Sequence, residues 1–380
     1  MRSRSQFIRL RLFRKTSVEK TSGVKASVEK PAVAKASVMK ASVMTATALA
    51  LVAVSACGSS SASSSASGSG AKAFKLVLPW YADPEGGGFF AAKSEGLYKS
   101  KNLDVTLQSG GPQVSATQLV AAGRAQVGFT DAAGLIQARE QGIPVVAIGA
   151  LYQDNPVGVM VHASTGITSF AGMGGKTWVV QTGQLGPEWV KKKTGITFST
   201  QAYQGSIANF LKKDSLVQQG WPTNEAYTAE KAGVKVNFVP FSTSGFNPYN
   251  DIFFTSESYL KSHRKELTDF LAASMQGWQD YMGKVSVAKT ANTAILKANS
   301  QLTSQAAWFA WDRQRKYVVA DEGKQRLGAM TQQRWTTFVD QMKQLGQLKS
   351  TPKASDLYDA SLLPEVPAPT MLPAAPAGSY

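Results

Sequence analysis

Cysteine and histidine are nearly absent from this chain, which has one cysteine and two histidines among 380 residues. A single cysteine forms no disulfide within the chain, so the fold must depend on apolar burial, for which this length suffices. His162 lies in an apolar segment and His263 near the start of a helical pattern, which favours structural roles. We therefore expect neither a catalytic histidine pair nor a metal site.

Complete nucleotide-binding and serine-enzyme motifs are also missing. Residues 175–177 (Gly-Lys-Thr) resemble the end of a phosphate-binding loop, but Phe170 stands where the first glycine is required. Residues 193–195 (Lys-Thr-Gly) and 350–353 (Ser-Thr-Pro-Lys) match motifs of penicillin-recognising serine enzymes in reversed order, without the Ser-Asp-Asn between them. We expect no catalysis and no cofactor.

The positive charge of the chain is concentrated at its amino-terminal end. Residues 1–56 hold eleven Lys and Arg and two Glu, so seven of the sixteen excess positive charges remain for residues 57–380. A surplus this small over 324 residues is not typical of a nucleic-acid-binding surface. We predict that nucleic acid is not a partner.

Cys57 follows an apolar segment, residues 43–56, whose only polar residues carry hydroxyl groups. The segment is too short to span a bilayer and ends in small residues, which is typical of a lipoprotein signal. The alternative, a buried cysteine in a helix, does not explain the basic flank and the cleavage pattern. We predict a signal region over residues 1–56 and a lipid anchor on Cys57, at the outer face of the cytoplasmic membrane.

A basic repeat precedes this signal. The pattern Lys-(Thr/Ala)-Ser-Val-(Glu/Met)-Lys recurs every ten residues and begins at Lys15, Lys25 and Lys35. Because Met39 followed by Lys40 is a more usual start, we interpret residues 1–38 as an artefact of gene prediction or a dispensable extension. Residues 57–72 are mostly Ser, Ala and Gly and predict a flexible linker.

From residue 73 onward, short apolar runs alternate with helical patterns, which is typical of an α/β fold. We expect strands at residues 74–78, 103–107, 125–130, 144–148, 177–181, 214–217, 234–241 and 251–254. We expect helices at residues 89–98, 114–122, 132–141, after 185, around 207, at 225–232 and at 263–282, with a further apolar stripe at 335–345. The nearly continuous apolar runs favour parallel strands covered on both faces.

This order predicts two α/β lobes with a hinge, joined where the chain crosses between them near residues 158–162 and 251–255. Lobe 1 would comprise residues 73–160 plus 253–350, and lobe 2 residues 161–252. Residues 351–380 would form a C-terminal tail, loose in its proline-rich part. Because ligands of such sheets bind beyond the carboxyl ends of the strands, we expect a monomer that closes on a small molecule.

The opening of the folded region resembles solute-binding proteins of ABC importers, in the branch that binds nitrate, sulfonates, taurine and thiamine-pyrimidine precursors. The resemblance is carried by residues 78–85, 88–98 and 103–105, and then by residues 119–131, 142–153, 166–177, 219–225 and 254–280. It implies a type II periplasmic-binding-protein fold with a helical C-terminal part packed on lobe 1. It also implies a membrane permease and its cytoplasmic ATPase as partners.

Aromatic and acidic residues follow the first strand, where the resemblance places the mouth of the cleft. Trp80 and Tyr81 offer a stacking surface for a planar ring, as does Phe89, unless it lies in the core. Asp83 and Glu85 come next and would be either solvated loop carboxylates or ligand contacts. The Trp-x-Pro-Asn pattern of the pyrimidine-binding members is altered at these positions.

Further candidates lie at later strand ends and helix starts. They are Thr130, Asp131, Thr182, Gly183, Trp221, Asn224 and Glu225. Asp131 would also serve as a helix N-cap, and the helix start after Thr182 would offer N–H groups to an anion. A carboxylate at Glu225 would accept hydrogen bonds from an amino group and repel a sulfonate or nitrate.

Three carboxylates and an aromatic pair favour a nitrogen heterocycle of the thiamine-pyrimidine-precursor type. The alternative is a sulfonate, taurine or nitrate, held by threonines and helix starts. Pyrimidine-synthesising enzymes that share the fold depend on histidine and a cysteine cluster. This chain has two histidines, to which we assign structural roles, and no cysteine cluster. A surface adhesin would explain the anchor and the linker but not the two lobes.

Overall fold

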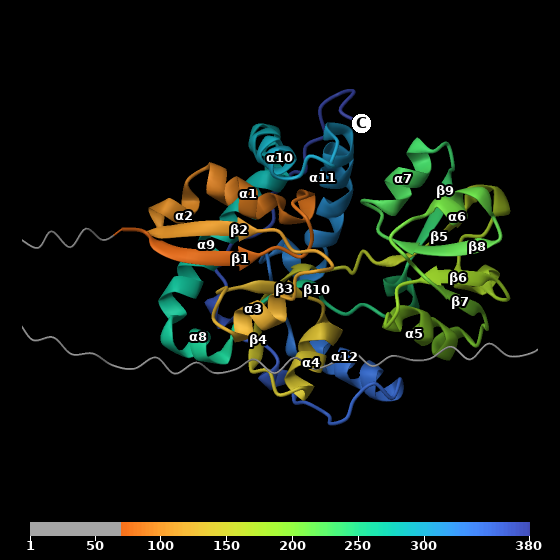
Figure 1. The fold of residues 1–380 in the computed structure, drawn as a ribbon, viewed down its shortest axis with the longest axis horizontal. Helices are drawn as coiled ribbons and strands as arrows, with labels where there is room; N and C mark the ends of the chain where they lie inside the picture. Colours follow the sequence, from red (N-terminus) through yellow and green to blue (C-terminus); the bar gives the residue numbers. More distant parts are fainter. Residues whose placement is uncertain (1–69) are drawn as a thin grey trace, which may run out of the picture. The chain divides into compact units, whose positions relative to one another are not determined.

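The computed structural model describes residues 70–380 (Figure 1). The predicted signal region, the extension over residues 1–38, the anchor at Cys57 and most of the linker lie outside the described residues. Within residues 70–380, no helix combines the length and the apolar character needed to cross a membrane.

Lobe 1 contains a parallel two-stranded sheet and an antiparallel three-stranded sheet, which one isolated bridge connects and which we together name the first sheet. Its strands are β1 (Lys72–Val77), β2 (Leu103–Gln108), β3 (Gly128–Thr130), β4 (Val145–Tyr152) and β10 (Asn250–Ser256). β1 and β2 pair in parallel, a bridge between Leu76 and Val127 joins β1 to the start of β3, and β10 lies between β3 and β4. β10 runs antiparallel to both of its neighbours. The expectation of parallel pairing was therefore wrong for β4, which is buried along its whole length but pairs with the returning strand.

The second sheet, which defines lobe 2, has the strand order β7-β6-β8-β5-β9. Its strands are β5 (Gly158–His162), β6 (Thr177–Val180), β7 (Ser199–Ala202), β8 (Leu216–Gly220) and β9 (Val236–Pro240). It carries the helices α5 (Leu185–Thr194), α6 (Ala208–Lys212) and α7 (Glu225–Lys231). The sequence did not predict β7, because all four of its residues are exposed and none marks a buried face.

The remaining helices pack around the first sheet and the crossings between the lobes (Figure 1). They are α1 (Gly87–Ser94), α2 (Leu97–Ser100), α3 (Ala116–Ala121), α4 (Ala132–Glu140), α8 (Glu257–Ser262), α9 (Arg264–Gly283), α10 (Val285–Ala298), α11 (Ser304–Val318) and α12 (Gln332–Gln344). Short 3-10 helices are η1 (Pro84–Gly86), η2 (Ala163–Thr165), η3 (Phe170–Met173), η4 (Phe241–Ser244), η5 (Asp321–Lys324), η6 (Ala354–Asp356) and η7 (Ala360–Leu362).

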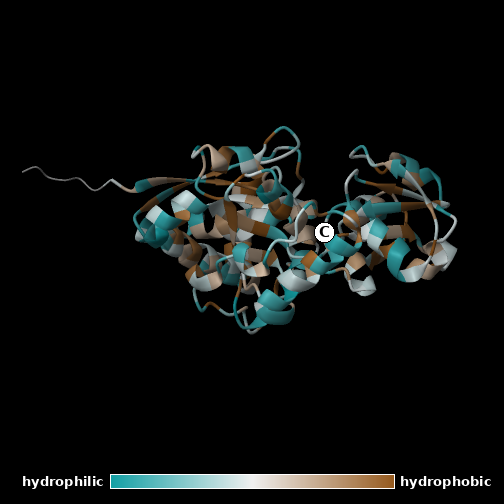
Figure 2. Ribbon diagram, turned by 90° about the horizontal axis from the view of Figure 1, so that it is seen from below, coloured by the Kyte–Doolittle hydropathy of each residue, from teal (hydrophilic) through white to brown (hydrophobic). Residues whose placement is uncertain are grey.

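The apolar stripe predicted for residues 263–282 forms the buried face of α9. Its six members are fully buried: Leu267, Phe270, Leu271, Met275, Trp278 and Met282. α1 packs against this face so closely that a Cβ on Gly88 would lie 2.2 Å from the ring of Trp278. Apolar residues concentrate in the strands of both sheets (Figure 2). The close packing of Gly88 against Trp278 fixes the position of α1 and of the loop that precedes it.

The proline-rich end is packed against lobe 1, in contrast to the loose tail that we expected. Proline carbonyls in this segment accept hydrogen bonds from side chains, including 2.7 Å from Arg315 to Pro373 and 3.0 Å from Gln279 to Pro367. The backbone N–H of Leu327 donates to Val366. Proline lacks an N–H group but keeps its acceptor, so long polar side chains from the helices hold a segment that forms no ladder of its own.

Candidate functional site

The topology of the first sheet gathers several chain segments at one edge. β1, β3 and β4 end at this edge, and β10, which runs antiparallel to β3 and β4, begins there. The first crossing occupies residues 153–157 and the second residues 245–249, each a few residues earlier than expected. The edge therefore adjoins both crossings, where ligands of such sheets bind.

The loop after β1 presents Asp83 and Glu85 at this edge. Oδ1 of Asp83 accepts a 3.0 Å hydrogen bond from the N–H of Glu85 and caps η1. Side chains from the helical region hold the loop carbonyls: Asn299 donates to Ala82 at 2.9 Å and Gln314 to Pro84 at 2.7 Å. The C-terminal helices thus position the acidic loop.

Asp131 and Asp251 come from neighbouring strands. Asp131 caps α4 through a 2.6 Å hydrogen bond from the N–H of Gly134. The pairing of Ile252 with Thr130 places Asp251 beside Asp131. Asp251 is 5% exposed, has a φ of +49°, and its Oδ2 has no hydrogen-bond partner among the described residues. A strained backbone and an unpaired buried oxygen both lower the stability of the folded state. Such features concentrate at functional sites, so Asp251 is a candidate binding residue.

Glu225 approaches from lobe 2, at the first turn of α7. Its Oε1 accepts a 2.9 Å hydrogen bond from Tyr203 and its Oε2 a 2.8 Å bond from the N–H of Trp221. A Cβ on Gly220 would lie 2.6 Å from the Cβ of Glu225, so only glycine leaves room there. Glu225 is therefore held rigidly, and its side chain is buried, with 7% of its surface exposed.

Two aromatic contacts join the lobes beside these carboxylates. The ring of Trp221 lies 5.8 Å from that of Tyr152, whose hydroxyl donates to Gln314 at 3.0 Å. The ring of Tyr227 on α7 lies 4.8 Å from that of Phe309 on α11. These contacts hold α7 against lobe 1, where the charge of Glu225 acts on Glu85 of the acidic loop.

Burial disfavours the charged form of every carboxyl group in this set. It raises the pKa of Asp83 from its ordinary 3.8 to about 7, against the opposing effect of backbone N–H groups. It raises the pKa of Glu85 well above its ordinary value, and nearby negative charge adds to the rise. That charge comes from Asp83, Asp251 and Glu225.

Asp251, Asp131 and Glu225 follow the same rule. Burial raises the pKa of Asp251 well above its ordinary value, and the charges of Asp83 and Asp131 add to this. Burial also raises the pKa of Asp131 and of Glu225, partly offset by their hydrogen bonds. We name these five residues, Asp83, Glu85, Asp131, Asp251 and Glu225, the acidic cluster. Within residues 70–380, none of them forms an ion pair with lysine or arginine.

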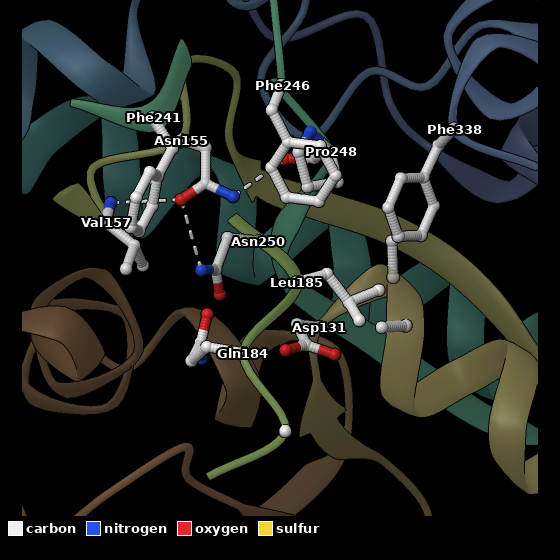
Figure 3. Close-up of a pocket in the computed structure, with 13 residues that line it drawn as sticks. Asp131, Asn155, Val157, Gln184, Leu185, Phe241, Phe246, Pro248, Asn250 and Phe338 are labelled. Carbon is white, nitrogen blue, oxygen red and sulfur yellow. Dashed lines mark hydrogen bonds between the residues drawn. The ribbon is translucent and has the colours of Figure 1, made fainter. Parts of the chain in front are cut away.

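A cavity of about 50 Å³ lies beside Asp131, and we name it the hinge cavity (Figure 3). Its polar lining comes from Asp131, Asn155, Gln184 and Asn250, and its apolar lining includes Val157, Leu185, Phe241, Phe246, Pro248 and Phe338. Asn155 joins the two crossings, because its side chain donates to Pro248 at 3.1 Å and accepts from the N–H of Val157 at 3.0 Å. The cavity therefore lies between the lobes and against the hinge.

Arg334 of α12 holds both crossings. Its guanidinium donates to the carbonyl of Gln153 in the first crossing and, at 2.8 Å, to that of Asn247 in the second. It also lies 4.1 Å from the centre of the Tyr249 ring. A single helix outside the cleft therefore restrains the hinge.

The structure brings some predicted site residues together and separates others. Asp83, Glu85, Asp131 and Glu225 meet in the acidic cluster, Thr130 precedes Asp131, Gly183 lines the hinge cavity, and Trp221 contacts Tyr152. Trp80 and Tyr81 are 46% and 50% exposed, and their rings lie 5.5 Å apart. Thr182 and Asn224 are exposed.

Phe89 requires a correction. It is fully buried and packs against Phe129, Phe253, Phe270 and Trp278. It therefore belongs to the core of lobe 1 and offers no stacking surface to a ligand.

Sequence reasoning missed Asp251, Tyr152 and the amide residues of the hinge cavity, Asn155, Gln184 and Asn250. For Asp251 a signal existed, since a carboxylate directly precedes the apolar run Ile-Phe-Phe. The others lie in segments that read as strand ends or loops, where polar residues are common.

The two histidines are far apart in the topology. Nε2 of His162, at the end of β5, lies 2.8 Å from the carbonyl of Phe210, and Nδ1 of His263, before α9, lies 2.7 Å from Oγ of Ser262. Across residues 70–380, no group of three or more His, Cys, Asp or Glu is placed to hold a metal ion.

Comparisons with known proteins agree on the fold. The sequence profile of a family described as "NMT1/THI5 like" matches residues 83–284. The periplasmic aliphatic sulphonate binding protein SsuA from Escherichia coli has a TM-score of 0.59 at 12% identity, over 81% of this chain and 97% of that one. The nitrate-binding protein NrtA from Synechocystis PCC 6803 has a TM-score of 0.52 at 13% identity, over 77% and 87%. These likenesses show an α/β periplasmic-binding-protein fold.

Curated relatives match a shorter region. The 4-amino-5-hydroxymethyl-2-methylpyrimidine phosphate synthase of Candida albicans (strain WO-1) is 28% identical over 125 residues, 32% of this chain and 37% of the relative. The enzyme of the same name from Legionella pneumophila is 28% identical over 101 residues, 27% of this chain and 32% of the relative. Each match spans about a third of the relative's length.

We expect the ligand-free protein to become less stable as the pH rises from about 4 to about 7. Because the pKa of Asp83 is raised from 3.8 to about 7 on folding, the folded state binds more protons in this window. The free energy of unfolding therefore falls with rising pH, and the groups whose pKa is lowered, Glu266 and Asp359, act only at lower pH. Urea unfolding at about pH 5 and pH 7.5 measures this, and higher stability at pH 7.5 would contradict it.

Asp251→Asn should stabilise the ligand-free protein at pH 7.5. The change removes a buried charge, and asparagine tolerates the positive φ of this position. Because the raised pKa of Asp251 opposes folding at pH 7.5 and asparagine does not ionise, we expect a gain of about 1 kcal/mol or more in the free energy of unfolding. The control is Asp214→Asn at an exposed position of lobe 2, which should change nothing. A loss of stability in Asp251→Asn alone would refute this account.

Proposed function

Because this chain belongs to the NMT1/THI5-like family and has the periplasmic-binding-protein fold, we propose that it is an extracytoplasmic receptor for a small nitrogen-containing solute. The receptor binds its ligand between the two lobes and closes on it. The parts proposed to move are the two lobes on either side of the crossings at residues 153–157 and 245–249, whose limits differ by a few residues from the sequence-derived units 73–160 plus 253–350 and 161–252. A permease with a cytoplasmic ATPase would receive the ligand.

The observation that carries this proposal is the acidic cluster. It consists of five buried carboxyl groups from both lobes, among which the charges of Asp83, Asp251 and Glu225 act on Glu85 and those of Asp83 and Asp131 act on Asp251, and no ion pair within residues 70–380 neutralises them. An amino group or a protonated ring nitrogen stabilises the ionised form of such carboxyl groups and so lowers their raised pKa values, whereas a sulfonate or nitrate opposes their ionisation. The cluster therefore favours a basic nitrogen compound over an oxyanion.

The aromatic pair Trp80 and Tyr81 supports a flat ligand. Both rings are exposed on the loop that ends in Asp83, so they are accessible for stacking. The names of the curated relatives contain an aminopyrimidine, which has a flat ring and an exocyclic amino group. Our leading ligand class is such a ring, and a sulfonate is the alternative because SsuA is named for sulphonate binding.

We propose binding without catalysis, although the curated relatives are named as synthases. The basis is the sequence, which lacks the cysteine cluster of the pyrimidine-synthesising enzymes and places its two histidines in separate lobes.

Glu225→Gln should weaken ligand binding. The change keeps the size of the side chain but removes the charge that lobe 2 contributes to the cluster. We expect at least a tenfold loss in affinity for 4-amino-5-hydroxymethyl-2-methylpyrimidine at pH 7.5, about 1.4 kcal/mol, measured by calorimetry. Asp214→Asn is the matched control and should bind as the unchanged protein does. Tight binding of taurine together with no heat from the pyrimidine would overturn the proposed ligand class.

Cys57→Ser should release the protein from the membrane. We propose that a lipid on Cys57 anchors the receptor at the outer face of the cytoplasmic membrane, since the apolar segment before it has the features of a lipoprotein signal. Detergent phase partitioning should move the variant from the detergent phase to the aqueous phase, and mass spectrometry of the N-terminal peptide should find the lipid only on the unchanged protein. An unmodified Cys57 would refute the anchor.

A further inference from the structure

The sheet of lobe 2 has one end beside the crossings and one end away from them. Gly158, the first residue of β5, follows the first crossing and pairs with the last residues of β8 and β9, Gly220 and Pro240. β6 runs parallel to β7 and to β8, so both of these neighbours also end on the crossing side. The opposite end, where β6, β7, β8 and β9 begin, we name the distal end.

The lysines of lobe 2 gather at this distal end. Residues 158–240 contain eight lysines, no arginine and four acidic residues, so they hold four of the seven excess positive charges of residues 57–380. α5 and α6 both end in lysines, directly before the chain returns to the start of β7 and of β8, and another lysine directly precedes β9. We name the following six residues the lysine edge: Lys191, Lys192, Lys193, Lys212, Lys213 and Lys235.

The positive charge of the lysine edge is mostly unpaired. Lys191 is half-buried and forms a 2.9 Å ion pair with Glu188, whereas the other five lysines are exposed and form no ion pair among the described residues. Attraction to helix C-terminal carbonyls accounts for lysines at the ends of α5 and α6. It does not account for Lys235, which precedes a strand. The edge therefore carries more positive charge than the helices need.

The composition of the edge excludes several kinds of partner. Protein interfaces centre on aromatic residues and arginine and are depleted in lysine. Nucleic acids are bound through arginine at base edges or through aromatic rings that stack on bases. The edge has no arginine, and the exposed large apolar side chains of residues 70–380 all lie outside lobe 2: Trp80, Tyr81, Met371, Leu372 and Tyr380. What remains is attraction by charge alone.

Exposed lysines spread over several elements suit a surface with many mobile phosphate groups. The lysine ammonium is a hydrated point charge on a flexible stem, so it requires no fixed geometry from its partner. Clusters of basic residues are attracted to a bilayer by the negative potential of its anionic headgroups. A bilayer is also the surface closest to a receptor that carries a lipid on Cys57.

We propose that the lysine edge binds the anionic headgroups of the membrane and holds lobe 2 at the bilayer surface. This inference rests on the proposed function for the location of the protein at a membrane. The lipid on Cys57 tethers lobe 1, which the chain enters at β1, so the lysine edge gives lobe 2 an attachment of its own. Because the distal end lies away from the crossings, this attachment does not cover the hinge.

Acetylation of single lysines, measured by mass spectrometry, tests this contact in the full chain with Cys57→Ser, which carries no lipid. Vesicles of phosphatidylcholine containing phosphatidylglycerol should lower the reactivity of the lysine edge about twofold or more, and vesicles of phosphatidylcholine alone should not. The exposed Lys289 and Lys297 of α10 should keep their reactivity. High salt should abolish the protection. Equal protection of both groups, or none, would overturn the proposal.

A matched pair of variants measures how much the edge contributes to binding. The first variant neutralises four lysines of the edge and the control four exposed lysines of lobe 1, so both lose the same charge. The first carries Lys192→Gln, Lys193→Gln, Lys212→Gln and Lys213→Gln, and the control Lys99→Gln, Lys101→Gln, Lys289→Gln and Lys297→Gln. Cosedimentation with the anionic vesicles should be about tenfold weaker for the first variant than for the control.

The basic residues 1–56 are the same in both variants, so their own charge cancels from this comparison. Equal binding by the two variants, with thermal unfolding showing that both are folded, would refute the assignment to lobe 2. Protection of the lysine edge by duplex DNA but not by anionic vesicles would overturn the choice of a membrane as the partner. Because no solute is present in these measurements, their failure leaves the proposed solute receptor intact.

Discussion

The burial of like charges is the constraint on which the rest of this structure depends. The charges of Asp83, Asp251 and Glu225 raise the energetic cost of ionising Glu85, and those of Asp83 and Asp131 raise the cost of ionising Asp251. Buried carboxylates in proteins are usually paired with arginine or lysine, because an unpaired buried charge is destabilising. Because no such pair exists among the described residues, the cluster lowers the stability of the protein. A positively charged partner would remove this cost.

Much of the surrounding architecture serves to hold this cluster in place. Gly88 allows α1 to lie against Trp278, and the acidic loop immediately before α1 is tied by Gln314 and Asn299. The same Gln314 accepts from Tyr152, which contacts Trp221 of lobe 2. The helical C-terminal region thus supports the site from behind although it contributes no carboxylate to the cluster. Rigid positioning of this kind keeps repelling groups from rotating apart.

The sequence predicted most elements of the fold, because apolar runs such as those of β4 and α9 leave strong patterns. It missed β7, whose exposed residues carry no such pattern, and it could not give the direction of β4 pairing, which depends on a strand about a hundred residues later. For the candidate site, Asp83 and Glu225 were predicted because carboxylates that follow strands stand out in the sequence. Asp251 was missed because only the antiparallel return of β10 brings it beside Asp131. Phe89 was misplaced because sequence alone does not show which aromatic residue of a helix faces the core.

The attachment of both crossings to Arg334 has a consequence for the apparent affinity of this protein for a ligand. Apparent affinity is the intrinsic affinity scaled by the fraction of molecules already in the binding-competent form. Since one guanidinium on α12 binds the carbonyls of Gln153 and Asn247, substitutions that displace Arg334 are expected to alter this fraction, although Arg334 is not among the residues of the acidic cluster. In the proposed receptor, the apparent affinity for the solute could therefore change without a change in the residues that contact it.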